Sequence, residues 1–93
     1  MQPAVAFGRV LRRLRQRKGW TQEELGLEAD LRRTFISVLE LGQQQPTLTT
    51  ILKLSSVLEI KPGRVLDLVD KELTASTTSR ERTGESANLS RGK

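Results

Sequence analysis

The sequence predicts an all-α domain of five short helices followed by a polar tail. Apolar residues recur at the helical spacing of three and four positions, and no segment gives a strand signal. A chain of 93 residues, of which 35% are hydrophobic, can close one modest core but not two. We therefore expect one folded domain over residues 1–73 and a disordered tail over residues 74–93.

The first helix is predicted over residues 4–18. Its apolar positions recur at i, i+3, i+4 and i+7, the spacing of one buried stripe, and they are Phe7, Val10, Leu11 and Leu14. Pro3 suits the start of this helix and Gly19 its end. A second helix follows, because Thr21 and Glu24 form the T-x-x-E capping-box pattern.

The third helix is predicted over residues 32–41, where the periodicity restarts in a new phase and Gly42 follows as a stop. Its buried side consists of Phe35, Ile36 and Leu39. At about 100° per residue, the opposite side has a polar N-terminal end and an apolar C-terminal end. The residues on that outward side are Arg33, Thr34, Ser37, Val38 and Leu41.

Two more helices complete the predicted domain. Thr47 is a suitable N-cap for the fourth, and Pro62 opens the fifth, which extends to about Leu73. The segment from Thr74 onward is rich in Ser, Thr, Gly and charged residues and has no aromatic residue. Such a composition buries too little apolar surface to offset the entropy of ordering, so it predicts disorder.

Composition excludes several classes of function. The 16 Lys and Arg against 11 Asp and Glu give a net charge of +5, which favours a polyanionic partner, either nucleic acid or an acidic protein. Without cysteine or histidine there are no disulfides, no usual zinc site and no histidine acid/base chemistry. We expect no enzyme, no cofactor and no metal. No membrane span or secretory signal is evident, so we expect a cytoplasmic protein.

Residues 6–70 resemble the Cro/repressor type of helix-turn-helix domain, also called the xenobiotic response element family. The resemblance implies a five-helix, lambda-repressor-like DNA-binding domain in which the second helix of the motif enters the major groove. In this chain that reading helix is Arg32–Leu41. The positions that carry the resemblance are Arg15, Gly19, Thr21, Gln22, Glu24, Leu25, Ile36, Leu39, Glu40, Gly42, Pro46, Leu48, Leu54 and Leu58.

The resemblance places the base-reading residues in the third helix, and they are Arg32, Arg33, Thr34, Ser37 and Val38. Arg33 is the leading candidate, because an arginine can bond bidentately to guanine O6 and N7, worth about 1–3 kcal/mol of discrimination. Val38 is apolar yet outward and suits contact with a thymine methyl group. Arg32 stands at the N-cap position of this helix, where the family usually has a small polar residue. Its side chain is expected to reach either a base or a phosphate.

A second group of residues is expected to contact phosphates without reading sequence. Gln22 resembles a family glutamine at the start of the second helix, where the helix N-terminus adds backbone donors. Six basic residues lie within ten positions at the end of the first helix, which favours phosphates nearby. The predicted phosphate contacts are Arg17, Lys18, Thr21, Gln22, Gln43, Gln44 and Gln45.

Two further predictions concern structure and assembly. Arg15 and Glu40 lie at the edges of their apolar stripes, and the resemblance implies a partly buried ion pair between them. The fifth helix has more apolar residues than one edge of a small core can bury. We therefore expect these residues to form a homodimer surface. They are Val65, Leu66, Leu68 and Val69.

The sequence thus predicts a transcriptional regulator that binds double-stranded DNA as a symmetric dimer. No small-molecule ligand is evident. The alternative is a protein-interaction adaptor or an antitoxin with the same fold. In that case the chain, with its net charge of +5, would bind an acidic protein. Salt dependence separates the two readings, since several phosphate contacts give a steep fall of affinity with salt.

Overall fold

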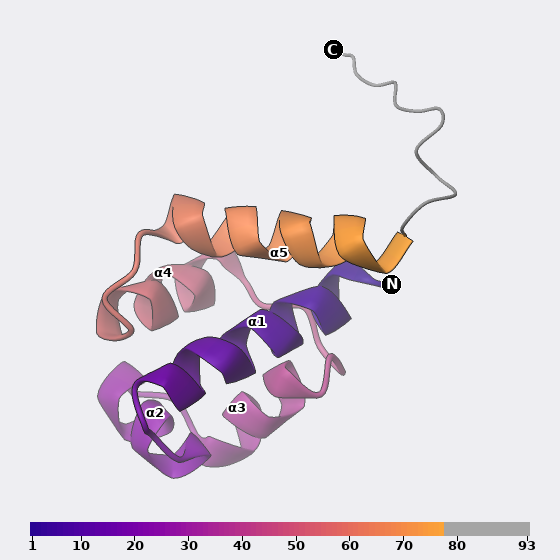
Figure 1. Ribbon diagram of the computed structural model, residues 1–93. Coiled ribbons are helices and arrows are strands. Elements are labelled where there is room, and N and C mark those ends of the chain that lie inside the picture. The colour runs from indigo at the N-terminus through magenta and orange to yellow at the C-terminus, as the bar shows by residue number, and fades with distance from the viewer. Residues whose placement is uncertain (78–93) are drawn as a thin grey trace.

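The computed structural model describes residues 1–77, with side chains through residue 75. Within this part the chain forms helices and no strand, which confirms the predicted all-α, five-helix fold. None of these helices is long and apolar enough to cross a membrane. The helices are α1 (Pro3–Arg17), α2 (Gln22–Ala29), α3 (Arg33–Glu40), α4 (Leu48–Val57) and α5 (Pro62–Thr77) (Figure 1).

The last helix differs from the prediction at its end. We expected the helical domain to stop at Leu73, but α5 continues to Thr77. The predicted disorder of residues 78–93 lies outside the described residues.

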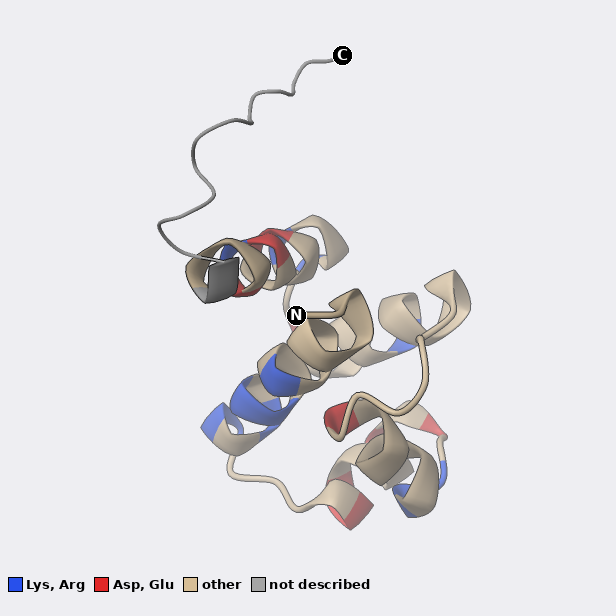
Figure 2. Cartoon of the chain, turned by 90° about the vertical axis from the view of Figure 1, so that its right-hand side faces the viewer, with Lys and Arg blue, Asp and Glu red and all other residues tan. Residues whose placement is uncertain are grey.

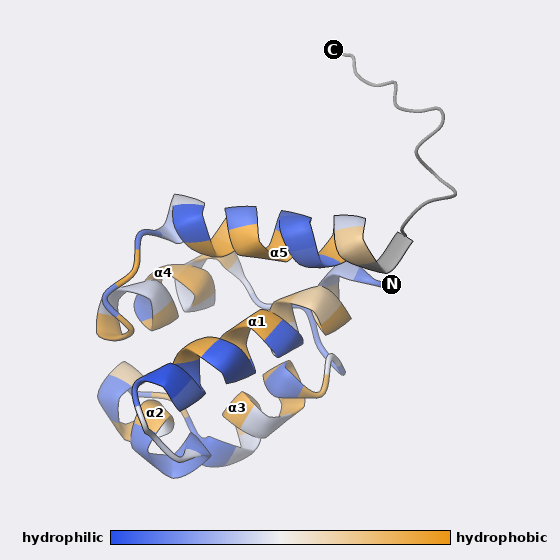
Figure 3. Cartoon of the chain, viewed as in Figure 1, coloured by the Kyte–Doolittle hydropathy of each residue, from blue (hydrophilic) through white to orange (hydrophobic). Residues whose placement is uncertain are grey.

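Helix α1 is the centre of the domain. It packs against α3 on one side and against α5 on another, while α2 packs against α3 and α4, and α4 against α5. In Figure 1, α5 crosses one end of the domain, and α2 and α3 form the opposite end. The helices turn their hydrophobic sides toward one another (Figure 3). The reading helix therefore lies at the end of the molecule away from α5.

The core draws on all five helices. Its most completely buried members include Leu11, Leu25, Ile36, Leu39 and Leu54, each at most 2% exposed. Burial of a leucine or isoleucine side chain stabilises a fold by about 1.5–3 kcal/mol. Trp20 packs against this core from the α1–α2 loop.

Caps define the helix ends as the sequence indicated. Thr21 Oγ1 accepts a hydrogen bond of 3.1 Å from the Glu24 N–H, and the Thr21 N–H donates to Glu24 Oε1 at 2.8 Å, which completes the capping box. Thr47 Oγ1 likewise accepts from the Thr50 N–H at 3.1 Å. Arg32 occupies the N-cap of α3 without a side-chain cap, so this helix start lacks that anchor.

Two local features set the distance between helices. A Cβ on Gly8 would lie 2.4 Å from the Leu39 carbonyl oxygen and 2.6 Å from that of Glu40, so α1 and α3 approach almost backbone to backbone. In the α2–α3 turn, Asp30 adopts the left-handed conformation with φ 58°, where glycine is the usual residue. The sequence patterns gave no sign of the role of Gly8.

Candidate DNA interface

The outward side of α3 presents the predicted reading residues to solvent. Arg33 and Thr34 are exposed in its first turn, while Ser37 and Val38 are partly buried in the second. On the opposite side, Ile36 and Leu39 are fully buried and Phe35 packs against the core. This anchor explains the arrangement of the segment RRTFISV, because the buried side chains fix the helix with Arg33 and Thr34 facing out.

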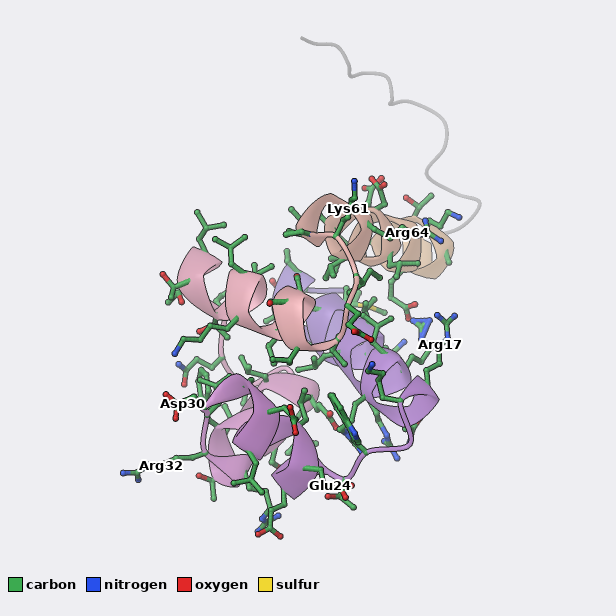
Figure 4. All side chains as sticks on the ribbon, turned by 90° about the vertical axis from the view of Figure 1, so that its left-hand side faces the viewer. Arg17, Glu24, Asp30, Arg32, Lys61 and Arg64 are labelled. Carbon is green, nitrogen blue, oxygen red and sulfur yellow. The ribbon has the colours of Figure 1, made fainter. Side chains whose placement is uncertain are left out.

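Arg32 precedes α3 in an extended conformation, with φ −72° and ψ 145°. Figure 4 shows its side chain directed away from the domain. Within the part of the chain that has described side chains, no hydrogen bond or ion pair engages the side chains of Arg32, Arg33 or Thr34. Their side-chain donors are therefore available to a ligand.

The predicted ion pair between Arg15 and Glu40 forms beside this surface. Arg15 Nε donates to Glu40 Oε2 at 2.6 Å and Nη2 donates to Glu40 Oε1 at 2.9 Å, with side chains only 11% and 4% exposed. Arg15 Nη1 also donates to the Trp20 carbonyl oxygen at 2.8 Å. The hydrogen bonds to Glu40 raise the pKa of Arg15 above its ordinary value. The pair joins α1 to the C-terminal end of α3.

Gln22 is a third member of this network, which sequence reasoning did not foresee. Its Nε2 donates to Glu40 Oε1 at 3.1 Å and the residue is partly buried. The contact fixes the orientation of the amide at the first position of α2. Among the described residues the second amide N–H has no acceptor, so it remains free to donate to a phosphate.

The glutamine loop lies at the other end of α3. Gly42 has φ 72° and its N–H donates to the Leu39 carbonyl oxygen, and the Gln43 N–H donates to that of Val38, each at 3.1 Å. These bonds close the helix in the manner of a Schellman motif. The side chains of Gln43, Gln44 and Gln45 are exposed just beyond it.

Two predicted phosphate contacts are not placed with the others. Arg17 lies beside α5, where it lines a small hollow with Val10, Leu14 and Leu68. Figure 4 shows Arg17 and Arg32 on opposite sides of the domain. The cluster of basic residues on α1 favoured phosphates nearby but could not tell which neighbouring helix Arg17 adjoins. Its role as a phosphate contact stays a prediction.

Lys18 is also directed elsewhere. Its Nζ donates to Glu59 Oε1 at 2.8 Å and lies 5.1 Å from the centre of the Trp20 ring. The hydrogen bond lowers the pKa of Glu59 below its ordinary value. Because Glu59 follows α4, Lys18 faces the α4–α5 loop, and its role as a phosphate contact stays a prediction.

The predicted dimer surface on α5 also needs correction. Val65 and Val69 are only 4% and 9% exposed and belong to the core of the chain itself. Leu68 is partly buried against that core, whereas Leu66 is 49% exposed. The reason is that α5 packs against both α1 and α4, so the core uses more of its apolar positions than one edge would.

Comparison with known proteins identifies the family. The family model described as helix-turn-helix matches residues 11–65. The chain belongs to the helix-turn-helix family of the Cro/repressor type. The match over residues 11–65 includes α2 and α3, the two helices joined by the short turn at Asp30.

Several relatives of this helix-turn-helix chain are regulators. Control protein C.BamHI of Bacillus amyloliquefaciens is 40% identical over 64 residues, which cover 68% of this chain and 79% of the relative. The uncharacterized HTH-type transcriptional regulator y4dJ of Sinorhizobium fredii is 36% identical over 59 residues, which cover 63% of this chain and 77% of the relative. The crystal structure of the restriction-modification controller protein C.AhdI from Aeromonas hydrophila matches with TM-score 0.65 and 40% identity, covering 67% of this chain and 94% of that one.

Proposed function

We propose that this helix-turn-helix protein is a sequence-specific regulator of transcription that inserts α3 into the major groove of double-stranded DNA. One observation carries the proposal: Arg33 and Thr34 are exposed and unengaged in the first turn of a helix whose other side is locked into the core. A reading helix contacts base edges with its N-terminal residues, so Arg33 is placed to bond guanine.

Hydrogen-bond donors on both sides of α3 support this docking, because they could contact phosphates. On one side, α2 begins at Gln22 with free backbone donors and a positive helix end. On the other, the exposed amides of Gln43, Gln44 and Gln45 follow the helix. A duplex whose groove receives α3 would meet Gln22 and Thr21 along one strand and the glutamine loop along the other. These contacts fix the register of the protein on DNA.

We place the symmetric dimer surface on α4 and α5. Both helices carry exposed leucines, namely Leu48 at 69%, Leu52 at 47% and Leu66 at 49% exposure. Apolar side chains exposed on neighbouring helices are typical of an interface between subunits. Two copies joined there would present two reading helices, and such dimers bind half-sites about one helical turn apart.

Selection of bound duplexes from a random DNA pool tests the proposal. We expect enrichment of a two-fold symmetric motif containing guanine, and we expect Arg33→Ala to lose the guanine preference. Arg64→Ala is the matched control, because Arg64 is an exposed arginine of α5 at the end of the domain away from α3 (Figure 4). Enrichment of no motif would favour the adaptor or antitoxin reading. The likeness to the two control proteins favours the regulator.

A further inference from the structure

The outward side of α3 consists of two parallel rows of side chains. Arg33 and Ser37, at i and i+4, carry hydrogen-bonding groups. Thr34, Val38 and Leu41, at i, i+4 and i+7, carry methyl groups and form a second row on the same side. We call Thr34, Val38 and Leu41 the methyl row.

The methyl row is open to a ligand along its length. Leu41 is 64% exposed, Thr34 is exposed and Val38 is partly so. Leu41 keeps helical geometry, with φ −83° and ψ −3°, so it continues the row past the last residue of α3. Side chains on a helix lean toward its N-terminus, and Leu41 therefore covers the turn that contains Val38.

The length of the row matches a few base pairs. Seven residues of helix advance about 10 Å, which corresponds to about three base steps at 3.4 Å each. Lying beside Arg33 and Ser37, the row faces the same groove that these residues would read. The one apolar group that unmodified bases display in the major groove is the 5-methyl group of thymine.

We propose that the methyl row reads pyrimidine 5-methyl groups, those of thymine or of 5-methylcytosine, over up to three adjacent steps of each half-site. The inference rests on the proposed DNA-reading function and extends it from one side chain to a surface that responds to DNA methylation. Contact removes apolar surface of both partners from water. Each methyl group contacted strengthens binding about three- to fivefold.

The test replaces thymine by uracil in the selected operator, one position at a time, and measures the dissociation constant of each duplex. Uracil differs from thymine only by the missing methyl group and pairs in the same way. We expect weaker binding by about three- to fivefold at one to three adjacent positions per half-site. At any cytosine of the same stretch of the half-site, 5-methylcytosine in place of cytosine should strengthen binding by a similar factor, which separates the two sources of the methyl group.

Protein variants assign the effect to the row. Val38→Ser and Leu41→Asn should bind thymine and uracil duplexes with equal affinity at the affected positions. The matched control is Leu27→Asn, which alters an exposed leucine of α2 (75% exposed) outside the row and should keep the full discrimination.

The outcomes separate the inference from the proposed function. Equal affinity of the parent for every uracil duplex would overturn the methyl row while leaving sequence-specific binding intact. The same holds if the Val38→Ser and Leu41→Asn variants discriminate as well as the parent. Failure of the parent to select any operator would remove the proposed function and the methyl row together.

Discussion

Arg15 lies where three helices meet, and its contacts show how single residues position the reading surface. The side chain spans from α1 to Glu40 at the end of α3 and to the Trp20 carbonyl oxygen before α2. Gln22 adds α2 to the same carboxylate. A largely buried ion pair contributes little net stability when complete, yet removal of one partner leaves a lone buried charge. The main effect of the network is therefore to fix the orientation of α3 relative to α1 and α2, and its net contribution to the free energy of unfolding is small.

Removal of either charge at this junction should destabilise the fold. We expect Arg15→Ala or Glu40→Ala to lower the free energy of unfolding by about 3–5 kcal/mol, measured by urea denaturation. Lys18→Ala is the control, since its partner Glu59 is a side chain 77% exposed, and it should leave the midpoint nearly unchanged. Equal midpoints for Arg15→Ala and the parent would show that the ion pair has no structural role.

At the scale of the helices, sequence patterns located each element well but not its neighbours. Thr21, Thr47 and Pro62 mark helix starts, because capping and proline chemistry are local. Which side of α1 meets α3 and which meets α5 depends on tertiary packing. For that reason the cluster of basic residues on α1 could not show that Arg17 adjoins α5, and counting apolar residues on α5 overestimated its free surface at Val65.

The close approach of α1 to α3 could likewise not be predicted from the spacing of apolar residues, because glycine has no side chain that contributes to that pattern. A Cβ on Gly8 would lie too close to the Leu39 and Glu40 carbonyl groups at the end of α3, whereas a Cβ on Gly63 in α5 would meet nothing within 4 Å. Of these two helical glycines, only Gly8 limits the packing.

Alanine substitutions at these two positions should therefore have opposite signs. Gly8→Ala forces α1 away from the Leu39 and Glu40 carbonyl groups and should cost about 1–3 kcal/mol of stability. Gly63→Ala only reduces the freedom of the unfolded chain and should stabilise by about 0.5 kcal/mol. Thermal unfolding of both variants measures the difference. A Gly8→Ala protein as stable as the parent would contradict the close contact of α1 and α3.

For the molecule as a whole, charge and apolar surface are distributed to different sides. Lys and Arg gather along one side of α1 (Figure 2), where Arg9 and Arg13 both pair with Glu72 of α5. The exposed leucines proposed for the dimer lie on α4 and α5, and the reading residues lie on α3 at the other end. This separation allows two copies to join without covering α3. That α3 reads DNA stays a prediction of the family resemblance, whereas packing decides which residues surround this helix.

The central claim is that Arg33 of α3 bonds the major-groove edge of a guanine, and a base analogue tests it directly. In the selected operator, each guanine is replaced in turn by 7-deazaguanine, which lacks the N7 acceptor, and the dissociation constant is measured for the parent and for Arg33→Ala. The proposed contact predicts that one replacement per half-site weakens the parent about tenfold or more and leaves Arg33→Ala unaffected. Equal binding of the parent to all these duplexes, or the same loss in Arg33→Ala, would contradict it.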